Sequence, residues 1–146
     1  MLELFQFLAA LSAGLFAGAA LYISVVEHPA RMMLDTRAAV TQWALSYKRA
    51  TWLQAPLASI SLVCGAAVWL MGAGAAWLAA ALAIGAVVPF TFIVVMPTNH
   101  QILAPRRDLD SVETRTVLTR WGKLHAVRSA LGFVAAGLDL WLLRGA

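Results

Sequence analysis

Charge and cysteine are both scarce in this chain. Only 12% of its 146 residues are charged, whereas 62% are hydrophobic, and the mean hydropathy is +0.78. A water-soluble domain of this length does not need so large an apolar fraction. Cys64 is the single cysteine and lies in an apolar run, so it indicates neither a disulfide framework nor a redox compartment. The composition therefore argues against a soluble domain and predicts an integral membrane protein.

Other absences narrow the functional classes. The sequence has no glycine-rich dinucleotide-binding motif and no H-x3-H or H-E-x2-H pair of the kind that holds zinc. The net charge of +4 comes from basic residues beside apolar stretches, where membrane orientation explains them better than nucleic-acid binding does. We therefore expect membrane lipid and a hydrophobic small molecule as partners, and no nucleic acid.

Four apolar stretches account for most of the length. They cover about residues 4–26, 52–71, 75–96 and 124–143, and each is long enough as a helix to cross roughly 30 Å of hydrocarbon. No Lys or Arg precedes the first stretch, which favours a retained helix over a signal peptide. The prediction is a single all-α domain over residues 1–146, an integral membrane four-helix bundle.

The basic residues predict the orientation. Two connecting segments, residues 27–51 and 97–123, hold nine of the eleven Lys and Arg residues. Because basic loops stay on the cytoplasmic side, we expect both segments there and both termini on the non-cytoplasmic side. A bacterial inner membrane is the expected location.

Both connecting segments contain helical patterns. Residues 36–51 place Val40, Trp43 and Tyr47 opposite Arg37 and Lys48, which predicts an amphipathic interfacial helix between the first two spans. Residues 110–123 also read as helical, and the simplest interpretation is that they extend the fourth span.

A ladder of small residues lies on the first span. Ala10, Gly14 and Gly18 recur every four residues, a spacing that lets another helix approach closely in a membrane. We expect this ladder to pack inside the bundle; a homo-oligomer formed through it is the alternative.

Polar residues gather at one end of the apolar stretches. Trp121, His125 and Arg128 fall at i, i+4 and i+7, so they share one helical stripe. Arg128 lies about one turn inside the fourth span, and a charge at that depth needs a partner. Glu27 is the acid at the matching depth of the first span. We therefore predict a Glu27 to Arg128 contact.

This cluster admits two interpretations. In the catalytic one, Glu27 or His125 acts as a general base and Arg128 stabilises negative charge on an enolate or phenolate. Asn99 then holds a substrate carbonyl or hydroxyl, unless it only caps the end of the third span. In the structural one, Glu27 and Arg128 form a buried lock without chemistry.

Further candidates surround the cluster. Tyr47, Lys48, His28 and Trp121 are the other expected substrate-binding residues, although interfacial anchoring explains Lys48 equally well. His28, His125 and Glu27 are candidate ligands for a metal ion, since imidazole and carboxylate suit zinc, iron, copper or manganese.

The motifs together resemble the anthrone oxygenase-like family of small four-helix membrane proteins. The resemblance rests on Glu27-His28-Pro29, Trp43-x3-Tyr47, Pro97-Thr98-Asn99 and, above all, Trp121-x3-His125-x2-Arg128. It implies an oxidoreductase that acts on a hydrophobic aromatic molecule, with Asn99, Trp121, His125 and Arg128 in the site. Such oxidation needs a base, an oxyanion partner and a dry pocket in principle, so no cofactor is required, and a metal ion remains an option.

Three alternatives stay open at this point. One is a metal-dependent membrane enzyme that uses the histidines. Another is a non-enzymatic protein that binds a lipid or a small ligand at the same cluster. The third is a purely structural membrane subunit, which a fully enclosed Glu27 to Arg128 pair without an adjacent pocket would favour.

Overall fold

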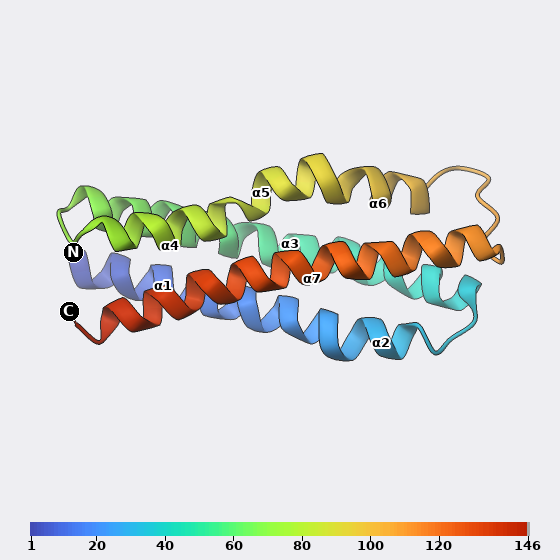
Figure 1. Cartoon of the computed structure of the whole chain (residues 1–146), viewed down its shortest axis with the longest axis horizontal. Coiled ribbons are helices and arrows are strands. Elements are labelled where there is room, and N and C mark those ends of the chain that lie inside the picture. The colour runs from blue at the N-terminus through green and yellow to red at the C-terminus, as the bar shows by residue number, and fades with distance from the viewer. Residues whose placement is uncertain (146) are drawn as a thin grey trace.

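The computed structural model describes residues 1–145, which form four helical rods lying side by side (Figure 1). The first rod consists of α1 (Leu2–Tyr22), the π-helical turn η1 (Ile23–Glu27) and α2 (His28–Arg31), and the second is α3 (Thr36–Leu70). The third consists of α4 (Ala75–Gly85), α5 (Val87–Phe90), the π-helical turn η2 (Thr91–Val95) and α6 (Met96–Ile102), and the fourth is α7 (Val112–Leu143).

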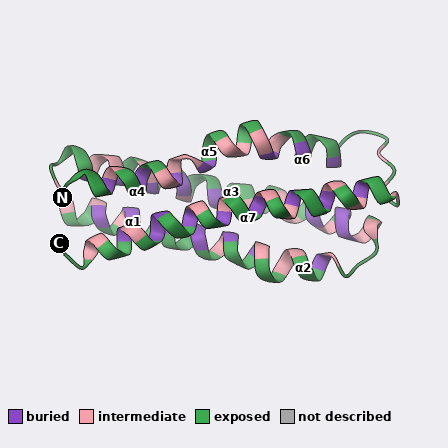
Figure 2. Cartoon of the chain, viewed as in Figure 1, coloured by how far each residue is buried: buried purple, intermediate pink, exposed green. Residues whose placement is uncertain are grey.

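All four rods are long and apolar enough to cross a membrane. The prediction of an all-α membrane four-helix bundle is therefore confirmed, and the chain is an integral membrane protein. Exposed positions lie on the outer faces of the rods and buried positions between them (Figure 2).

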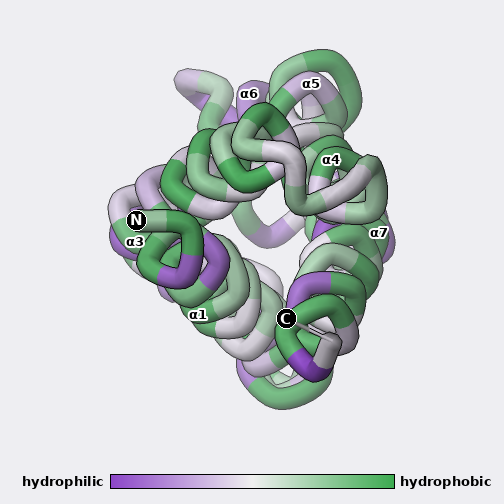
Figure 3. The backbone as a smooth tube through the Cα atoms, turned by 90° about the vertical axis from the view of Figure 1, so that its left-hand side faces the viewer, coloured by the Kyte–Doolittle hydropathy of each residue, from purple (hydrophilic) through white to green (hydrophobic). Residues whose placement is uncertain are grey.

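The rods form a ring. α1 packs against both α3 and α7, and α4 packs against the same two helices, so α3 and α7 face each other diagonally (Figure 3). Both chain ends lie at the same end of the ring, and both long connections lie at the other (Figure 1). The polar motifs of the sequence thus come from rods that converge at one end of the bundle.

The interfacial helix expected over residues 36–51 is not a separate element. α3 runs without a break from Thr36 to Leu70, after Asp35 caps it by accepting a hydrogen bond from the backbone N–H of Ala38 at 2.8 Å. Residues 36–51 contain no Gly or Pro to end the helix. Its apolar face, including the fully buried Trp43, continues into the core, so the bundle extends beyond the expected span.

α7 also extends beyond its expected span. It begins at Val112, where the Ser111 hydroxyl accepts a hydrogen bond from the backbone N–H of Thr114 at 3.1 Å. The interpretation that residues 110–123 extend the fourth span is therefore confirmed.

Two π-helical turns interrupt the first and third rods at similar positions along the bundle. π-helical turns are rare and occur frequently at functional sites. Near η2, Pro89 lacks the backbone N–H that would continue the helical ladder. The segment from α5 to α6 stands away from α3 there (Figure 1). Residues of α3, α5 and η2 line a cavity that is described below.

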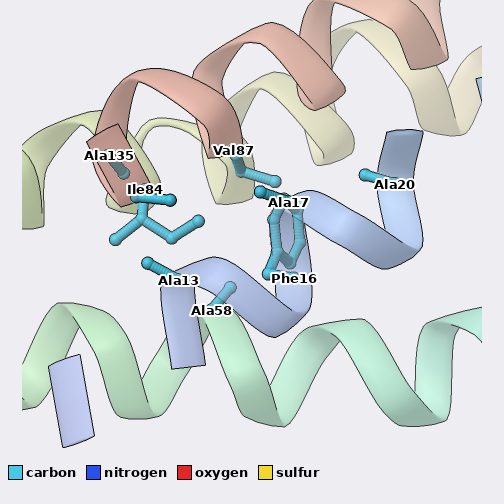
Figure 4. Close-up of a cluster of buried hydrophobic side chains, with 9 residues drawn as sticks. Ala13, Phe16, Ala17, Ala20, Ala58, Ile84, Val87 and Ala135 are labelled. Carbon is cyan, nitrogen blue, oxygen red and sulfur yellow. The ribbon is translucent and has the colours of Figure 1, made fainter. Parts of the chain in front are cut away.

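A core of small side chains surrounds Phe16 in the middle of the bundle (Figure 4). Phe16 has no exposed surface, and a Cβ added at Gly132 of α7 would come within 2.7 Å of its ring. Gly132 therefore permits the close approach of α7 to α1. Phe16 also lines the cavity between α3 and the segment from α5 to η2 that is described below.

The small-residue ladder of α1 does not pack inside the bundle as expected. Gly14 and Gly18 are exposed, and a Cβ added at either would meet no atom within 4 Å. Only Ala10 is buried. The inward face of α1 is instead the neighbouring stripe that contains Ala13 and Phe16, because that face carries the side chain that fills the core.

Candidate functional site

A cavity of about 260 Å³ lies between α3 and the segment from α5 to η2. This volume is just below the range of roughly 300–1,000 Å³ that is typical of small-molecule sites. Most of its wall is apolar, and the exposed residues Ala55 and Ser59 of α3 and Val88 and Phe92 across from them also line it. The cavity therefore opens sideways between apolar helices.

One wall of this cavity is polar. Tyr47, Thr51 and Gln54 follow one another along one face of α3, and Arg128 reaches the same wall from α7. Arg128 Nη2 donates a hydrogen bond to Gln54 Oε1 at 3.1 Å. Arg128 Nε and Gln54 Nε2 are buried and have no hydrogen-bond partner among residues 1–145. Arg128 thus lines the cavity with one neutral hydrogen-bond acceptor from residues 1–145, the Gln54 side chain.

A second cavity of about 20 Å³ adjoins the first. The two share Tyr47, Thr51, Gln54 and Arg128, and the smaller one is also lined by Trp121 and His125. Its volume is sufficient for about one water molecule or another molecule of that size. His125 therefore borders the same polar wall as Arg128.

The His125 ring is almost fully buried, with 2% of its surface exposed. Its Nδ1 lies 3.0 Å from the hydroxyl of Ser24 in η1, and that hydroxyl lies 2.8 Å from the hydroxyl of Ser129 in α7. The other ring nitrogen, Nε2, forms no hydrogen bond within the described part of the chain. The ring is thus held at one nitrogen and left free at the other.

Aromatic and cationic groups surround Trp121. Its ring centre lies 5.0 Å from that of His125, 5.4 Å from that of His28 and 5.6 Å from that of Trp43 in an edge-on contact. The guanidinium of Arg31 lies 5.8 Å from the Trp121 ring centre, within cation–π distance. These contacts hold the Trp121 side chain in place, and the His125 ring packs on it.

The predicted Glu27 to Arg128 contact is wrong. Glu27 accepts hydrogen bonds from Arg31, with which it forms an ion pair, and from Gln42 Nε2 at 3.1 Å. Arg128 instead binds Gln54. The expected contact rested on matching depth alone, whereas the angular position of Glu27 at the end of the π-helical turn η1 turns its carboxylate to Arg31 and Gln42. Glu27 lines neither of the two cavities.

Three further candidates lie outside the cavities. His28 is half-buried against Gly122, where an added Cβ would collide with its ring. Asn99 is buried behind Met96, to whose sulfur its Nδ2 donates at 3.7 Å, and its Oδ1 has no partner in the described chain. Lys48 is exposed on the outer face of α3 and lines neither cavity.

The candidate metal ligands do not form a ligand set. Within residues 1–145, no group of three or more His, Cys, Asp or Glu side chains is placed to hold a metal ion. Glu27 is bound to Arg31, and the Trp121 ring contacts both His28 and His125. The alternative of a metal centre built from His28, His125 and Glu27 is therefore not supported by their positions.

Sequence reasoning missed several residues of the site. Gln54 had a detectable signal, because Tyr47, Thr51 and Gln54 fall at i, i+4 and i+7 and point polar groups to one face of an apolar helix. Ser129 likewise falls four residues after His125. Arg31 also had a signal, because it falls four residues after Glu27, the spacing of a helical ion pair. It was counted among the orienting charges of a loop, but only 3% of its surface is exposed.

Comparisons with known proteins bear on these residues. The family model described as anthrone oxygenase matches residues 43–138, which include Tyr47, Gln54, His125 and Arg128. Anthrone oxygenase tpcL of Aspergillus fumigatus is 35% identical over 72 residues, a match that spans 47% of this chain and 45% of that relative. This chain thus spans less than half the length of the relative. No solved structure matches the chain.

Proposed function

Because the chain belongs to the anthrone oxygenase family, we propose that it is a membrane-embedded oxygenase that oxidises a hydrophobic aromatic ketone of the anthrone type. The proposed site is the polar wall shared by the two cavities. Arg128 and His125 are its proposed catalytic residues, and Tyr47, Gln54 and Trp121 contact the substrate. Glu27 is not part of the proposed site, because its carboxylate is paired with Arg31 and it lines a separate groove with Ser46 and Gln54 instead of the two cavities.

One observation carries this proposal: Arg128 faces the larger cavity without a carboxylate partner within residues 1–145. A guanidinium inside a membrane span is costly unless an anion or several acceptors compensate it. Gln54 supplies one neutral acceptor, and the buried Nε remains unpaired. An oxygen that becomes negative in the cavity beside this guanidinium would be stabilised by its positive charge, which lowers the barrier to forming the anion.

The proposed chemistry begins with proton removal. An anthrone has acidic benzylic C–H bonds opposite its carbonyl, and His125 Nε2 takes one of these protons as a general base. The electron pair of the broken C–H bond delocalises onto the carbonyl oxygen, which becomes a phenolate beside Arg128 and Gln54. The wall thus stabilises the charge at the oxygen while the base acts at the carbon.

Dioxygen is the oxidant in the next steps. It forms a C–O bond at the electron-rich carbon, and the resulting peroxide anion takes a proton from the imidazolium of His125. Loss of the remaining benzylic proton with cleavage of the O–O bond gives the second carbonyl of a quinone and one water molecule. One dioxygen is consumed per substrate, one of its oxygen atoms enters the product, and His125 returns to its neutral form.

The position of the opening supports entry from the bilayer. The larger cavity opens between apolar, exposed residues of α3 and of the segment from α5 to η2. An aromatic ketone partitions into hydrocarbon, so a lateral opening gives access without crossing water. Closure of the site away from water also strengthens the electrostatic contacts at the polar wall.

The structural alternative required an enclosed Glu27 to Arg128 pair with no pocket beside it. The pair is absent, and Arg128 lines a cavity. Non-enzymatic binding of a lipid or small ligand in the same cavity is separated from catalysis by the experiment below.

We further propose that the chain lies in a bacterial inner membrane with both termini on the non-cytoplasmic side. The support is the concentration of Lys and Arg at the end of the bundle that holds both long connections. Reporter fusions at residues 105 and 145 test this orientation: a cytoplasmic reporter active at residue 105 and inactive at residue 145 is expected, and the reverse pattern would overturn it.

The activity test uses the full chain reconstituted in lipid vesicles with an anthrone, and follows quinone formation and dioxygen uptake. Protein-free vesicles give the spontaneous rate. His125→Gln and Arg128→Gln should each lower the protein-dependent rate by about 100-fold or more. Arg120→Gln, an exposed arginine on the same helix, should not. Equal rates in the wild type and both site variants would overturn the proposed roles. Stoichiometric binding of the anthrone without turnover would identify a binding protein instead.

A further inference from the structure

The hydroxyls of Ser24 and Ser129 form a chain that starts at His125 and ends at a backbone carbonyl. His125 Nδ1 lies 3.0 Å from Ser24 Oγ, Ser24 Oγ lies 2.8 Å from Ser129 Oγ, and Ser129 Oγ donates to the carbonyl of Ala20 at 3.0 Å. Ser129 is buried, with 5% of its surface exposed. Each serine can donate only one hydrogen, so the direction of the bond at one end of this chain sets the direction of the others.

The carbonyl end indicates the direction. Three acceptors surround Ser129 Oγ, and two of them, the carbonyls of Ala20 at 3.0 Å and His125 at 3.2 Å, can only accept, whereas Ser24 can also donate. When the single hydrogen of Ser129 points to one of these carbonyls, Ser129 accepts from Ser24. Ser24 has then used its own hydrogen, and it must accept from His125 Nδ1.

We infer that Ser24 and Ser129 are positioning residues that hold neutral His125 in the tautomer with the proton on Nδ1 and the lone pair on Nε2. The juxtaposition that carries this inference is a histidine ring bound at Nδ1 by a hydroxyl chain that ends on a backbone carbonyl, while its Nε2 has no partner within residues 1–145. Ser129 thus influences the tautomer of His125 through Ser24. When Ser129 donates to the Ala20 carbonyl, it accepts the hydrogen of Ser24, and Ser24 is left to accept the hydrogen of His125 Nδ1.

The π-helical turn η1 contributes Ser24 to this chain. Ser24 lies in the second position of η1, and Ala20 lies in the last full turn of α1 before it. Both partners of Ser129 on the first rod therefore come from the segment where the α-helical phase changes. This gives a physical role to a turn that the sequence alone did not predict.

The inference rests on the proposed function only for its consequence. With the lone pair on Nε2, the ring has a proton acceptor in the one position not occupied by Ser24, as the proposed base requires. The tautomer itself is a property of the resting protein and can be measured without any substrate.

The test is ¹⁵N nuclear magnetic resonance on protein labelled only at histidine and reconstituted in lipid, at about pH 8.5, which is above the ordinary imidazole pKa of about 6.5. The three histidines are assigned with His28→Gln and His100→Gln. In the wild type, His125 should show a protonated Nδ1 and an unprotonated Nε2. A wild-type ring with its proton on Nε2 would overturn the inference.

Substitution of Ser129 gives the sharper result. In Ser129→Ala, Ser24 is free to donate to Nδ1, so the proton of His125 should move mainly to Nε2, and turnover should fall by about 10-fold or more. Ser129→Thr keeps the hydroxyl and should retain the wild-type tautomer. The matched control is Ser12→Ala, which removes another buried serine that donates to a helix carbonyl, that of Leu8 at 2.6 Å, far from His125.

The remaining outcomes also decide the matter. If Ser129→Ala does not fold, Ser24→Ala replaces it, and the Nδ1-protonated fraction should drop because Nδ1 loses its acceptor. An unchanged tautomer in the folded variant would overturn the role of the serines. A changed tautomer with unchanged turnover would uphold the inference and overturn the proposed role of His125 as base, so the two failures are distinguishable.

Discussion

Gln54 of α3 accepts a hydrogen bond from Arg128 of α7 at 3.1 Å, and these two residues join helices that lie diagonally across the bundle. Adjacent helices of a ring meet through their flanks, whereas diagonal helices meet only through side chains that cross its interior. The pair therefore spans the middle of the ring, where both residues line the two cavities. Because Gln54 is neutral, it holds the arginine in place without neutralising it.

Gln54→Glu should lower activity although it is almost isosteric. A carboxylate at this position would form an ion pair with Arg128, which would then contribute less to stabilising a phenolate on the substrate. We expect the rate of quinone formation to fall by about 10- to 100-fold without a loss of thermal stability. The control is Gln101→Glu on the exposed face of α6. A Gln54→Glu protein as active as the wild type would show that an uncompensated Arg128 is not required.

Gly122→Ala should destabilise the protein, because the new Cβ would collide with the His28 ring. Overpacking of this kind costs about 1–3 kcal/mol. Gly137→Ala on the same helix is the matched control, since nothing lies within 4 Å of its added Cβ, and it should leave the melting temperature unchanged or higher. Thermal unfolding of both variants in detergent measures the difference. Equal melting temperatures would contradict the packing of His28 on α7.

A bulky side chain at the opening of the larger cavity should hinder substrate entry. Ala55 is exposed and lines the cavity, so Ala55→Trp would place a bulky side chain at its mouth while leaving His125 and Arg128 unchanged in sequence. We expect kcat/KM for an anthrone delivered in vesicles to fall by about 10-fold or more. Ala126→Trp, also exposed but on α7 and outside the cavities, should have no such effect. If both variants retain wild-type kcat/KM, the substrate does not enter between α3 and the segment from α5 to η2.

Hydropathy and charge were sufficient to predict four membrane helices, because twenty apolar residues in lipid have few alternatives to a helix. Helical spacing likewise placed Trp121, His125 and Arg128 on one face. The partner of Arg128 could not be predicted in the same way. That prediction matched Glu27 to Arg128 by depth, which does not give the direction in which either side chain points, and no residue in the segment 23–27 signals a π-helical turn.

A hydropathy pattern also could not predict the residues at which α3 and α7 begin. α3 and α7 continue past their apolar spans because Trp43 and Leu118, which have no exposed surface, bury apolar side chains in these extensions. Caps at Asp35 and Ser111 set where the two helices begin. Such packing depends on residues distant in sequence. The same reason explains why Ser24 and Ser129, separated by 105 positions, gave no joint signal.

The ion pair between Arg37 and Asp110 predicts that the stability of the fold depends on pH. Arg37 Nη2 lies 2.5 Å from Asp110 Oδ2, and the hydrogen bonds from Arg37 lower the pKa of the Asp110 carboxyl below its ordinary value. A carboxylate whose pKa is lower in the folded state stabilises it above the unfolded pKa of about 3.9, and this contribution is lost as pH falls through the folded value.

Asp110→Asn should therefore lower the melting temperature slightly at about pH 7 and have no effect at about pH 2. The effect is small because both side chains are exposed, and about 1 M salt should reduce it further. Thermal unfolding of the wild type and the variant at both pH values measures it. A difference that persists undiminished at the lower pH would show that the ion pair is not its cause.

The central claim is that the polar wall of Arg128 and Gln54, together with His125, turns a neutral aromatic ketone into its anion before dioxygen reacts. The most direct test is the absorbance spectrum of an anthrone bound to the reconstituted protein at about pH 7 in the absence of dioxygen, where ionisation of an acid by a neutral histidine base can be seen separately from oxidation. The account predicts the long-wavelength absorption of the bound anion in the wild type, and its loss in His125→Gln and Arg128→Gln. The contradicting result is a wild-type protein in which the bound anthrone stays neutral without dioxygen and is nevertheless oxidised once dioxygen is admitted.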